Sequence, residues 1–558
     1  MAGFDMHQQK PAVADMAGEL ERGRESYKRH AWADAYQSFA LADKAAPLAT
    51  DDLELLAMSA YLTARDDEYL NALDRAYRAY LDGGENVRAV RCAFWLGLRL
   101  LFRGETGRAT GWLARARRLI ECEEHKCVEE GYLLLPVVEG HLDAGNCEAA
   151  YAIAGDAAEI GSRFGEADLI AIARHQQGLA SLRQGRVEKG LGLLDESMLA
   201  VTAGELSPLV TGLIYCSVID GCQQVYAVSR AREWTAALAR WCEDQPEMVS
   251  FTGKCLVHRA EIMQLHGAWS DAIVEARRGC ERFQKGIDPQ RPASALYQLA
   301  EIHRLQGDFA SAEEAYRSAS RWGKEPQPGL ALLRMAQGRL DVAAGAIRRV
   351  VSATTDPLQL ARLLPAYVEI SLGVGEIGDA RAACQTLKEI ADRFDTGLLG
   401  AIAAHAQGAV ELADGDAQAA LISLRRALQV WQQVEAPYEA ARTRLLVGLA
   451  CRAMADEESA CLELDASRAV FEQLGAAPDL SRLESLTRDA PSGHPHGLTP
   501  RELQVLRLIA TGKTNKVIAA ELFVSGRTID RHASNIFTKL SLLSRAAATA
   551  YAYEHQLI

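Results

Sequence analysis

The stretch ASALYQLAEIHRLQGDFASAEEAYRSASRWGKEP, residues 293–326, decides the fold of most of this chain. After Gly307, four residues follow at steps of three and four, as on one face of a helix: Phe309, Ala312, Tyr316 and Ala319. Before this glycine, the matching face of a preceding helix carries Leu296, Leu299 and Ala300. Small alanines let two helices approach closely, and the larger side chains fill the space between them. The stretch therefore predicts a pair of packed helices joined by a tight glycine turn.

The same turn recurs along the chain, at Gly104, Gly145, Gly185, Gly267, Gly307, Gly338, Gly375 and Gly415. Most neighbouring turns lie about 40 residues apart. A gap of 82 indicates a missing glycine near residues 229–234, and a gap of 31 indicates one shortened repeat. The pattern resembles the tetratricopeptide repeat, with its usual period of about 34 residues stretched to about 40. We expect about a dozen helix pairs between residues 17 and 475, stacked as a superhelix with an extended concave surface.

Small and apolar residues recur at the same positions beside other turns. They are Trp32, Ala35, Phe39 and Ala42; Ala109, Leu113 and Ala116; and Ala420, Leu424 and Ala427. Each set has the helical spacing seen after Gly307, so these residues are predicted to be buried between neighbouring helices.

The composition favours a folded protein without a membrane span or a disulfide framework. The 558 residues are 49% hydrophobic and 24% charged, no run of 18 apolar residues occurs, and the N-terminus MAGFDMHQQK lacks an apolar signal core. We therefore expect a cytoplasmic location. The twelve cysteines have no framework spacing, and CEEHKC at 122–127 is a weak metal signal. No nucleophile, carboxylate pair or metal cluster stands out, so the sequence predicts no enzyme, no cofactor and no metal site.

The charge is divided unequally. From Gly497 to the end, eight Lys and Arg face four acids, a net charge of +4. The whole chain carries −13, which leaves −17 for the first 496 residues. Two prolines and two glycines lie within residues 487–497, as in an exposed hinge. We predict a repeat array at 17–486, a flexible linker at 487–496 and a small basic domain at 497–558, which alone meets a polyanion.

Cap and turn residues predict four helices in this last domain. Thr499 caps the first, with Pro500 at its first position, and Gly512 ends it. Thr514 or Asn515 caps the second, Phe523 and Val524 form the next turn, and Ser525 and Ser544 cap the third and fourth.

The third of these helices lies in ELFVSGRTIDRHASNIFTKL, residues 521–540. Its buried stripe is predicted to be Ile529, Ile536 and Leu540, with Phe537 beside them. The opposite face carries Arg527, Asp530, Arg531, Ser534 and Asn535. Such side chains can hydrogen-bond base edges or phosphates, and a short turn with a scaffold helix precedes them. The pattern is typical of a helix-turn-helix, whose second helix enters the major groove.

Residues 497–558 resemble the LuxR-type DNA-binding domain, through LTPRELQVLRLIATG (498–512), TNKVIAAELFVSGRTIDRH (514–532) and SNIFTKL (534–540). The resemblance implies a four-helix domain whose third helix reads DNA and whose fourth commonly pairs with a second copy. Carried over by position, the implied base contacts are Asp530, Arg531, Ser534 and Asn535, and the implied phosphate contacts are Lys516, Arg527, Thr528 and Lys539. Asp530 departs from the basic residue often found at its position. The predicted pairing face of the fourth helix is Ala546, Ala547, Ala550 and Tyr551.

Together these features predict an all-α transcription regulator. A tetratricopeptide-like array would sense a protein, peptide or small-molecule partner and control a helix-turn-helix domain that reads double-stranded DNA as a homodimer. The alternative is a tetratricopeptide-type interaction scaffold whose last domain binds no DNA specifically.

Overall fold

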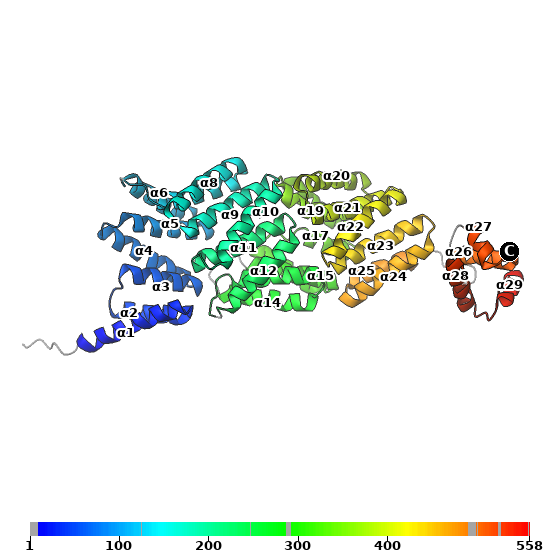
Figure 1. Cartoon of the computed structure of the whole chain (residues 1–558), viewed down its shortest axis with the longest axis horizontal. Helices are drawn as coiled ribbons and strands as arrows, with labels where there is room; N and C mark the ends of the chain where they lie inside the picture. Colours follow the sequence, from blue (N-terminus) through cyan, green and yellow to red (C-terminus); the bar gives the residue numbers. More distant parts are fainter. Residues whose placement is uncertain are drawn as a thin grey trace, which may run out of the picture. The chain divides into compact units, whose positions relative to one another are not determined.

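The computed structural model describes residues 9–123, 125–245, 247–285, 292–488, 500–522 and 526–555, together with Leu498 and Leu557. Every regular element in these residues is a helix, as the sequence predicted (Figure 1). The first helices are α1 (Gln9–Lys28), α2 (Trp32–Ala45), α3 (Thr50–Leu62), α4 (Asp66–Asp82), α5 (Asn86–Phe102), α6 (Thr106–Glu121), α7 (Glu129–Asp143), α8 (Cys147–Phe164), α9 (Ala167–Arg183) and α10 (Val187–Thr202).

The middle helices are α11 (Pro208–Gln224), α12 (Val228–Glu243), α13 (Thr252–Leu265), α14 (Trp269–Lys285), α15 (Pro292–Gln306), α16 (Phe309–Arg321), α17 (Gly329–Ala336), α18 (Leu340–Ala353), α19 (Pro357–Val374) and α20 (Ile377–Phe394). The last are α21 (Gly397–Ala413), α22 (Ala417–Gln433), α23 (Pro437–Ala453), α24 (Glu457–Leu474), α25 (Ala477–Arg488), α26 (Pro500–Ala510), α27 (Asn515–Glu521), α28 (Gly526–Lys539) and α29 (Arg545–Glu554).

The backbone divides into two compact units. The first comprises residues 1–406 and 429–437, and the second comprises residues 407–428 and 438–558. Within the second unit, α26 to α29 have a hydrophobic core of their own. The first two residues of the predicted linker, 487–488, belong to α25, and its remaining residues, 489–496, lie outside the described residues.

The turns within the helix pairs lie at the predicted glycines. All eight recurring glycines have positive φ angles, between 74° at Gly104 and 87° at Gly415, a region that favours glycine. The missing turn was predicted near residues 229–234, but these residues lie within α12. The turn instead lies at Tyr226, whose φ is 61°. The shortened repeat is also confirmed, because α17 has only 8 residues.

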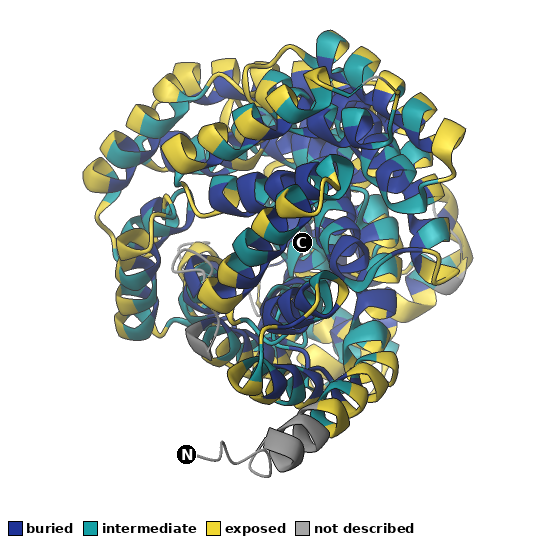
Figure 2. Ribbon diagram, turned by 90° about the vertical axis from the view of Figure 1, so that its left-hand side faces the viewer, coloured by how far each residue is buried: buried dark blue, intermediate teal, exposed yellow. Residues whose placement is uncertain are grey.

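The predicted faces are buried between the helices. Trp32, Ala35, Phe39 and Ala42 are fully buried, as are Ala312, Tyr316 and Ala319. Close approach is required at Gly178 on α9, where an added Cβ would lie 2.7 Å from Leu194 on α10. Figure 2 shows that buried residues lie on the sides of the helices that face other helices, and exposed residues on the opposite sides.

Odd-numbered helices form the inner layer of the first unit. Each helix pair packs internally, and successive odd helices from α5 to α19 also contact one another. Polar bonds that the sequence did not predict connect these neighbours: Gln176 to Glu139 (2.7 Å), His175 with Ser217 (2.7 Å), Gln223 to Glu261 (2.6 Å), Lys254 with Asp220, and Gln298 to Gln264. Burial lowers the pKa of His175 to about 4, so this imidazole is neutral at neutral pH.

Segments of the first unit that are about 200 residues apart also touch. Trp32 Nε1 donates to Gln245 Oε1 over 3.0 Å, across 213 residues of sequence. Arg232 and Glu435 pair at 3.2 Å across 203 residues. Such contacts mean that the stack turns back on itself after about five repeats, since small rotations between neighbouring repeats accumulate into a superhelix.

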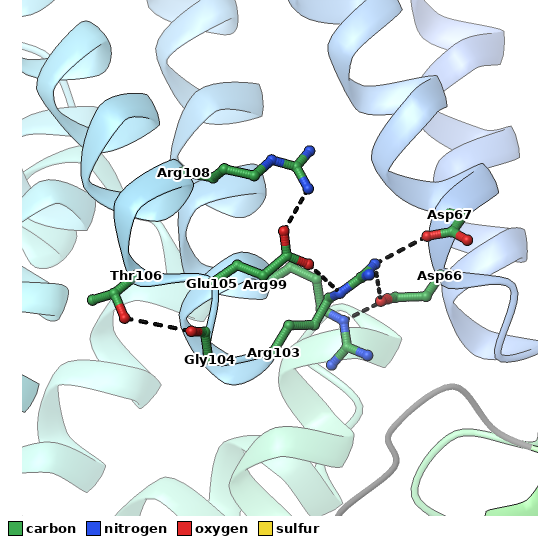
Figure 3. A network of polar contacts seen from close by, with 8 residues as sticks. All are labelled: Asp66, Asp67, Arg99, Arg103, Gly104, Glu105, Thr106 and Arg108. Atoms are coloured by element: carbon green, nitrogen blue, oxygen red, sulfur yellow. Dashed lines mark hydrogen bonds and ion pairs between the residues drawn. The ribbon is translucent and has the colours of Figure 1, made fainter.

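A buried ion pair connects the second and third helix pairs (Figure 3). Asp66, at the start of α4, accepts from Arg99 Nε of α5 at 2.5 Å, and the two side chains are only 2% and 8% exposed. Arg103 reaches the second Asp66 oxygen at 3.1 Å and also pairs with Asp67 and Glu105. The acidic Asp66 also lies in the first turn of α4, where the helix dipole favours a negative charge.

None of the helices in the described part of the chain is long and apolar enough to cross a membrane.

Candidate nucleic-acid interface

Four helices at the C-terminal end, α26 to α29, enclose one small core. Its fully or almost fully buried members are Leu498, Val505, Leu506, Ile509, Ile518, Ile529, Ile536, Ala548 and Ala552. Leu503, Leu522, Phe537 and Leu540 are partly buried beside them. Two helix boundaries agree with the predicted capping and terminating residues. Gly512 has a φ of 82° after α26, and the Ser544 hydroxyl accepts from the Ala547 N–H at 3.1 Å.

Other predicted caps and turns either differ from the prediction or lie outside the described residues. Thr514 occupies the N-cap position of α27, but its side chain makes no capping hydrogen bond. Thr499, Ser525 and the turn at 523–524 lie outside the described residues, as does the side chain of Arg527.

The third helix of the domain, α28, has one buried and one exposed face. Ile529 and Ile536 are fully buried, and Ala533 is 6% exposed. Asp530, Arg531, Ser534 and Asn535 are all exposed on the other side. The buried residues anchor α28 to the domain core, so its four predicted base-contact residues share a solvent-facing surface.

Asp530 belongs to a chain of polar contacts across three helices. The Asn515 amide of α27 donates to Asp530 Oδ1 at 2.7 Å. Arg545, at the start of α29, donates to Asn515 Oδ1 at 2.6 Å and also reaches the Lys513 carbonyl. These hydrogen bonds explain how the acidic Asp530 is accommodated on a face predicted to meet phosphates, because the Asn515 amide orients the Asp530 carboxylate.

The predicted phosphate contacts have different surroundings. Lys516 is exposed on α27, and Thr528 is partly buried. Lys539 pairs through Nζ with Glu502 Oε2 at 2.7 Å, and the Glu502 side chain is only 4% exposed. This contact ties the C-terminal end of α28 to α26, so Lys539 holds the helix in place in the protein without DNA.

The fourth helix presents its alanines on two sides. Ala548 and Ala552 are buried in the core, whereas Ala546 and Ala550 are exposed and Ala547 is partly exposed. Tyr551 packs beside the core, with its ring 4.1 Å from that of His555. Just before α29, Leu543 is fully exposed.

The sequence pattern does not indicate that Asn515, Arg545 and Glu502 are partners of the candidate site. Helical spacing indicates which side chains share one face of a helix, but it does not indicate which residues of other helices reach them. Leu543 could have been singled out from the sequence, because it is an apolar residue between two predicted helices. Among the described residues, no three His, Cys, Asp or Glu side chains are grouped as metal ligands would be.

Comparison with known proteins identifies this domain. Residues 496–552 match the family model of the bacterial regulatory proteins, luxR family. The transcriptional regulatory protein LiaR of Bacillus subtilis is 43% identical over 77 residues, which are 14% of this chain and 36% of LiaR. The nitrate/nitrite response regulator protein homolog of Haemophilus influenzae is 53% identical over 57 residues, 10% of this chain and 27% of that protein. The chain thus spans about a third of the length of these curated relatives.

Among solved structures, the crystal structure of a Rap protein complexed with Competence and Sporulation Factor covers 69% of this chain and 99% of its own. Its sequence identity is 12% and its TM-score is 0.39. This chain's own helices and turns therefore define its repeat architecture. The chain joins a tetratricopeptide-like helical repeat array to a C-terminal helix-turn-helix domain of the LuxR type.

Proposed function

We propose that this protein is a transcription regulator whose repeat array senses a partner and controls a C-terminal domain that reads DNA as a dimer. The observation that carries the proposal is the exposed polar face of α28, formed by Asp530, Arg531, Ser534 and Asn535. Arginine suits guanine, asparagine suits adenine, and an aspartate oxygen can accept from the cytosine amino group. A buried opposite face holds such a helix rigidly for insertion into the major groove.

The charge distribution supports the same assignment. The net +4 of residues 497–558 favours association with a polyanion, whereas the −17 of the preceding residues disfavours it. Lys516 and Thr528, with Arg527 and Lys539, are the proposed phosphate contacts. Lys539 would exchange or share its Glu502 partner when it meets a phosphate.

The proposal also assigns a separate role to each part of the chain. Residues 17–486 would form the sensor, 487–496 the linker and 497–558 the DNA-binding domain, in a cytoplasmic protein. The partner of the array would be a protein, a peptide or a small molecule.

The decisive experiment is binding of the full-length protein to a library of genomic DNA fragments at several salt concentrations. A regulator should select particular fragments, and its affinity for them should fall steeply as salt rises. Equally weak binding to all fragments would contradict the proposed function and favour the alternative, an interaction scaffold whose last domain binds no DNA specifically.

We expect Arg531→Ala to weaken binding to a selected site by about 1–3 kcal/mol and to relax base preference at one position. Lys516→Ala is the matched control, because it removes a proposed phosphate contact and leaves the base contacts in place. It should weaken binding to all sequences alike and reduce the salt slope by about 1. Binding to randomised sites, followed by sequencing, measures both effects. Equal losses without any change in base preference would contradict insertion of α28 into the groove.

We expect the protein to occupy its DNA site as a dimer that pairs through α29. Ala546 and Ala550 are exposed one helical turn apart, and Leu543 adds apolar surface close by in sequence. A two-fold dimer would place the same residues of both copies against each other. The proposal predicts footprints with two half-sites about one helical turn apart.

A charge placed on this surface tests the dimer. Ala550→Glu should leave the fold intact because the position is exposed, yet it should reduce occupancy of the two half-sites together. Thr511→Glu is the control, since Thr511 is exposed after α26 and outside the proposed face. A single half-site bound by one chain, as measured by light scattering, would disprove pairing.

A further inference from the structure

Polar and charged side chains meet between α11 and α13, two neighbouring helices of the inner layer. Asp220 and Gln223 lie about one turn apart on α11, and Lys254, His258 and Glu261 follow at steps of four and three on α13. These five residues form the α11–α13 cluster. The Lys254 ammonium pairs with Asp220 Oδ2, and the Gln223 amide donates to Glu261 Oε2 at 2.6 Å. Two polar contacts therefore already join these helices of successive repeats.

The centre of the α11–α13 cluster is His258, which is 2% exposed. Its Nε2 lies 3.7 Å from Asp220 Oδ1, and its Nδ1 lies 3.6 Å from Glu261 Oε2. Neither ring nitrogen makes a hydrogen bond within the described part of the chain. Leaving buried polar atoms without hydrogen bonds is costly, so the position of this ring between two carboxylates requires an explanation.

The charge of the ring decides whether both of its nitrogens can interact favourably with the carboxylates. A neutral imidazole has one N–H group and one lone pair, so one nitrogen would face a carboxylate oxygen with its lone pair. A protonated imidazole has two N–H groups, and each can be directed at one carboxylate in a charge-assisted contact. Only the protonated ring can therefore bind both carboxylates at once.

Two lysines also lie near these carboxylates. The Lys254 ammonium binds Oδ2 of Asp220, which is not the oxygen that faces the ring. The charge of Lys324, from the loop between α16 and α17, acts on both carboxylates. Burial would raise the pKa of the Glu261 carboxyl, but interactions with polar neighbours, the histidine ring first among them, lower this pKa overall. The Glu261 carboxylate is therefore charged at neutral pH and able to pair with the ring.

Charged groups on the other helices packed against α13 have partners of their own. Glu243 of α12 lies 3.8 Å from Arg259, and Glu275 of α14 lies 3.7 Å from the same guanidinium. On α15, Glu301 pairs with Arg304 at 2.7 Å. Within the described residues, the ion-pair contacts of the buried ring are those with the two carboxylates of the α11–α13 cluster.

We propose that His258 is a proton-sensitive contact between two successive repeats of the array. At low pH, the protonated ring pairs with Asp220 on α11 and with Glu261 on its own helix, and the pair with Asp220 holds the two helices together. As pH rises, the ring loses its proton, and one nitrogen then faces a carboxylate with its lone pair. The proposal stands on the position of the ring between the two carboxylates, and it is independent of the DNA-binding function.

The direction of the pH dependence follows from these contacts. When α11 and α13 separate, the ring loses the carboxylate on α11, so the packed state binds the proton more tightly than the separated state does. The contact is therefore strongest at low pH and weakens as pH rises through the range of about 5 to 8 in which an imidazole changes charge. Because small rotations between repeats accumulate along a superhelix, a weaker contact here would let the array flex more.

The test measures amide hydrogen exchange in the full-length protein between about pH 5.5 and pH 8.5, with each rate corrected for the pH dependence of chemical exchange. Protection of the amides in α11 and α13 should fall by about tenfold or more from the lowest to the highest pH, because a buried charge-assisted contact is lost. The helix α5 contains no histidine and serves as an internal reference. Its protection should change much less over the same range.

Three variants identify the groups involved. His258→Gln removes the titrating ring and should abolish the pH-dependent fall in protection. Asp220→Asn keeps a polar side chain of the same size at a position that is 37% exposed, so it should fold, and it should remove most of the fall. His266→Gln is the matched control, because His266 follows the same helix and its Nδ1 lies 3.9 Å from a Glu435 oxygen. It should leave the fall intact.

Several results would overturn the proposal. Protection of α11 and α13 that stays constant or increases as pH rises would do so, as would a fall of the wild-type size in His258→Gln or in Asp220→Asn. If His266→Gln abolished the fall, the proton-sensitive contact would be the one with Glu435, and His258 would have no such role. If His258→Gln does not fold, Asp220→Asn decides between these outcomes.

Discussion

Replacing Asp66 with alanine should destabilise the region of α4 and α5 by about 3–5 kcal/mol. The Arg99 guanidinium is almost completely buried, and Asp66 is the carboxylate that binds its Nε at 2.5 Å. Removing that carboxylate takes an ion-pair partner from a buried positive charge, and the loss of such a partner costs more than the pair itself contributes. Native-state hydrogen exchange in α4 and α5 measures the local free energy of opening, which suits a repeat protein that need not unfold in one step.

The neighbouring Asp67 provides the matched control. Asp67→Ala removes a carboxylate that binds the same Arg103, but the Asp67 side chain is 85% exposed. Water replaces such an interaction, so the expected loss is about 0–1 kcal/mol. The double variant Asp66→Ala, Arg99→Leu should recover most of the stability, because the buried positive charge is removed as well. Equal small losses in the two single variants would contradict the role assigned to the buried pair.

The local part of the array could be predicted from its sequence because each repeat is specified by nearby residues. The turn glycines recur about every 40 residues, and the buried alanines and the short repeat at α17 depend on shorter spacings still. The left-handed turn at Tyr226 carries no glycine, so the periodicity placed the missing turn a few residues too late, near 229–234.

Contacts between distant parts could not be predicted in this way. The bond from Trp32 to Gln245 depends on how far each repeat rotates against the next, a small angle that accumulates over about five repeats. The pairing of Asp66 with Arg99 depends on which rotamers meet between two helices. Neither follows from a periodic pattern, which fixes the face of a side chain and leaves its partner open.

In the candidate site, too, local features could be predicted from the sequence and contacts between helices could not. The polar face of α28 follows from its helical spacing, and the exposed positions of Arg531 and Asn535 agree with it. The contacts that position this face, from Asn515 to Asp530 and from Lys539 to Glu502, connect different helices and could not be predicted from the spacing.

Replacing Ile529 with alanine should unfold the C-terminal domain and abolish specific DNA binding. Ile529 is fully buried where α28 packs on the domain core. Truncation of a buried isoleucine to alanine costs about 2–5 kcal/mol, through lost burial and the cavity that remains. A core of this size supplies about 3–5 kcal/mol of net stability, so a single truncation can remove all of it.

Hydrogen exchange distinguishes this loss from a change in the DNA contacts. In Ile529→Ala, protection should disappear from α26 to α29 together, because they share one core, while the repeat helices keep theirs. Val517→Ala is the control: Val517 is an aliphatic residue on α27 that is 48% exposed, so its truncation should change neither protection nor binding by much. The result contrasts with Arg531→Ala, which should weaken binding and leave protection intact. If Ile529→Ala kept full protection but lost DNA binding, Ile529 would contact DNA and the assigned orientation of α28 would be reversed.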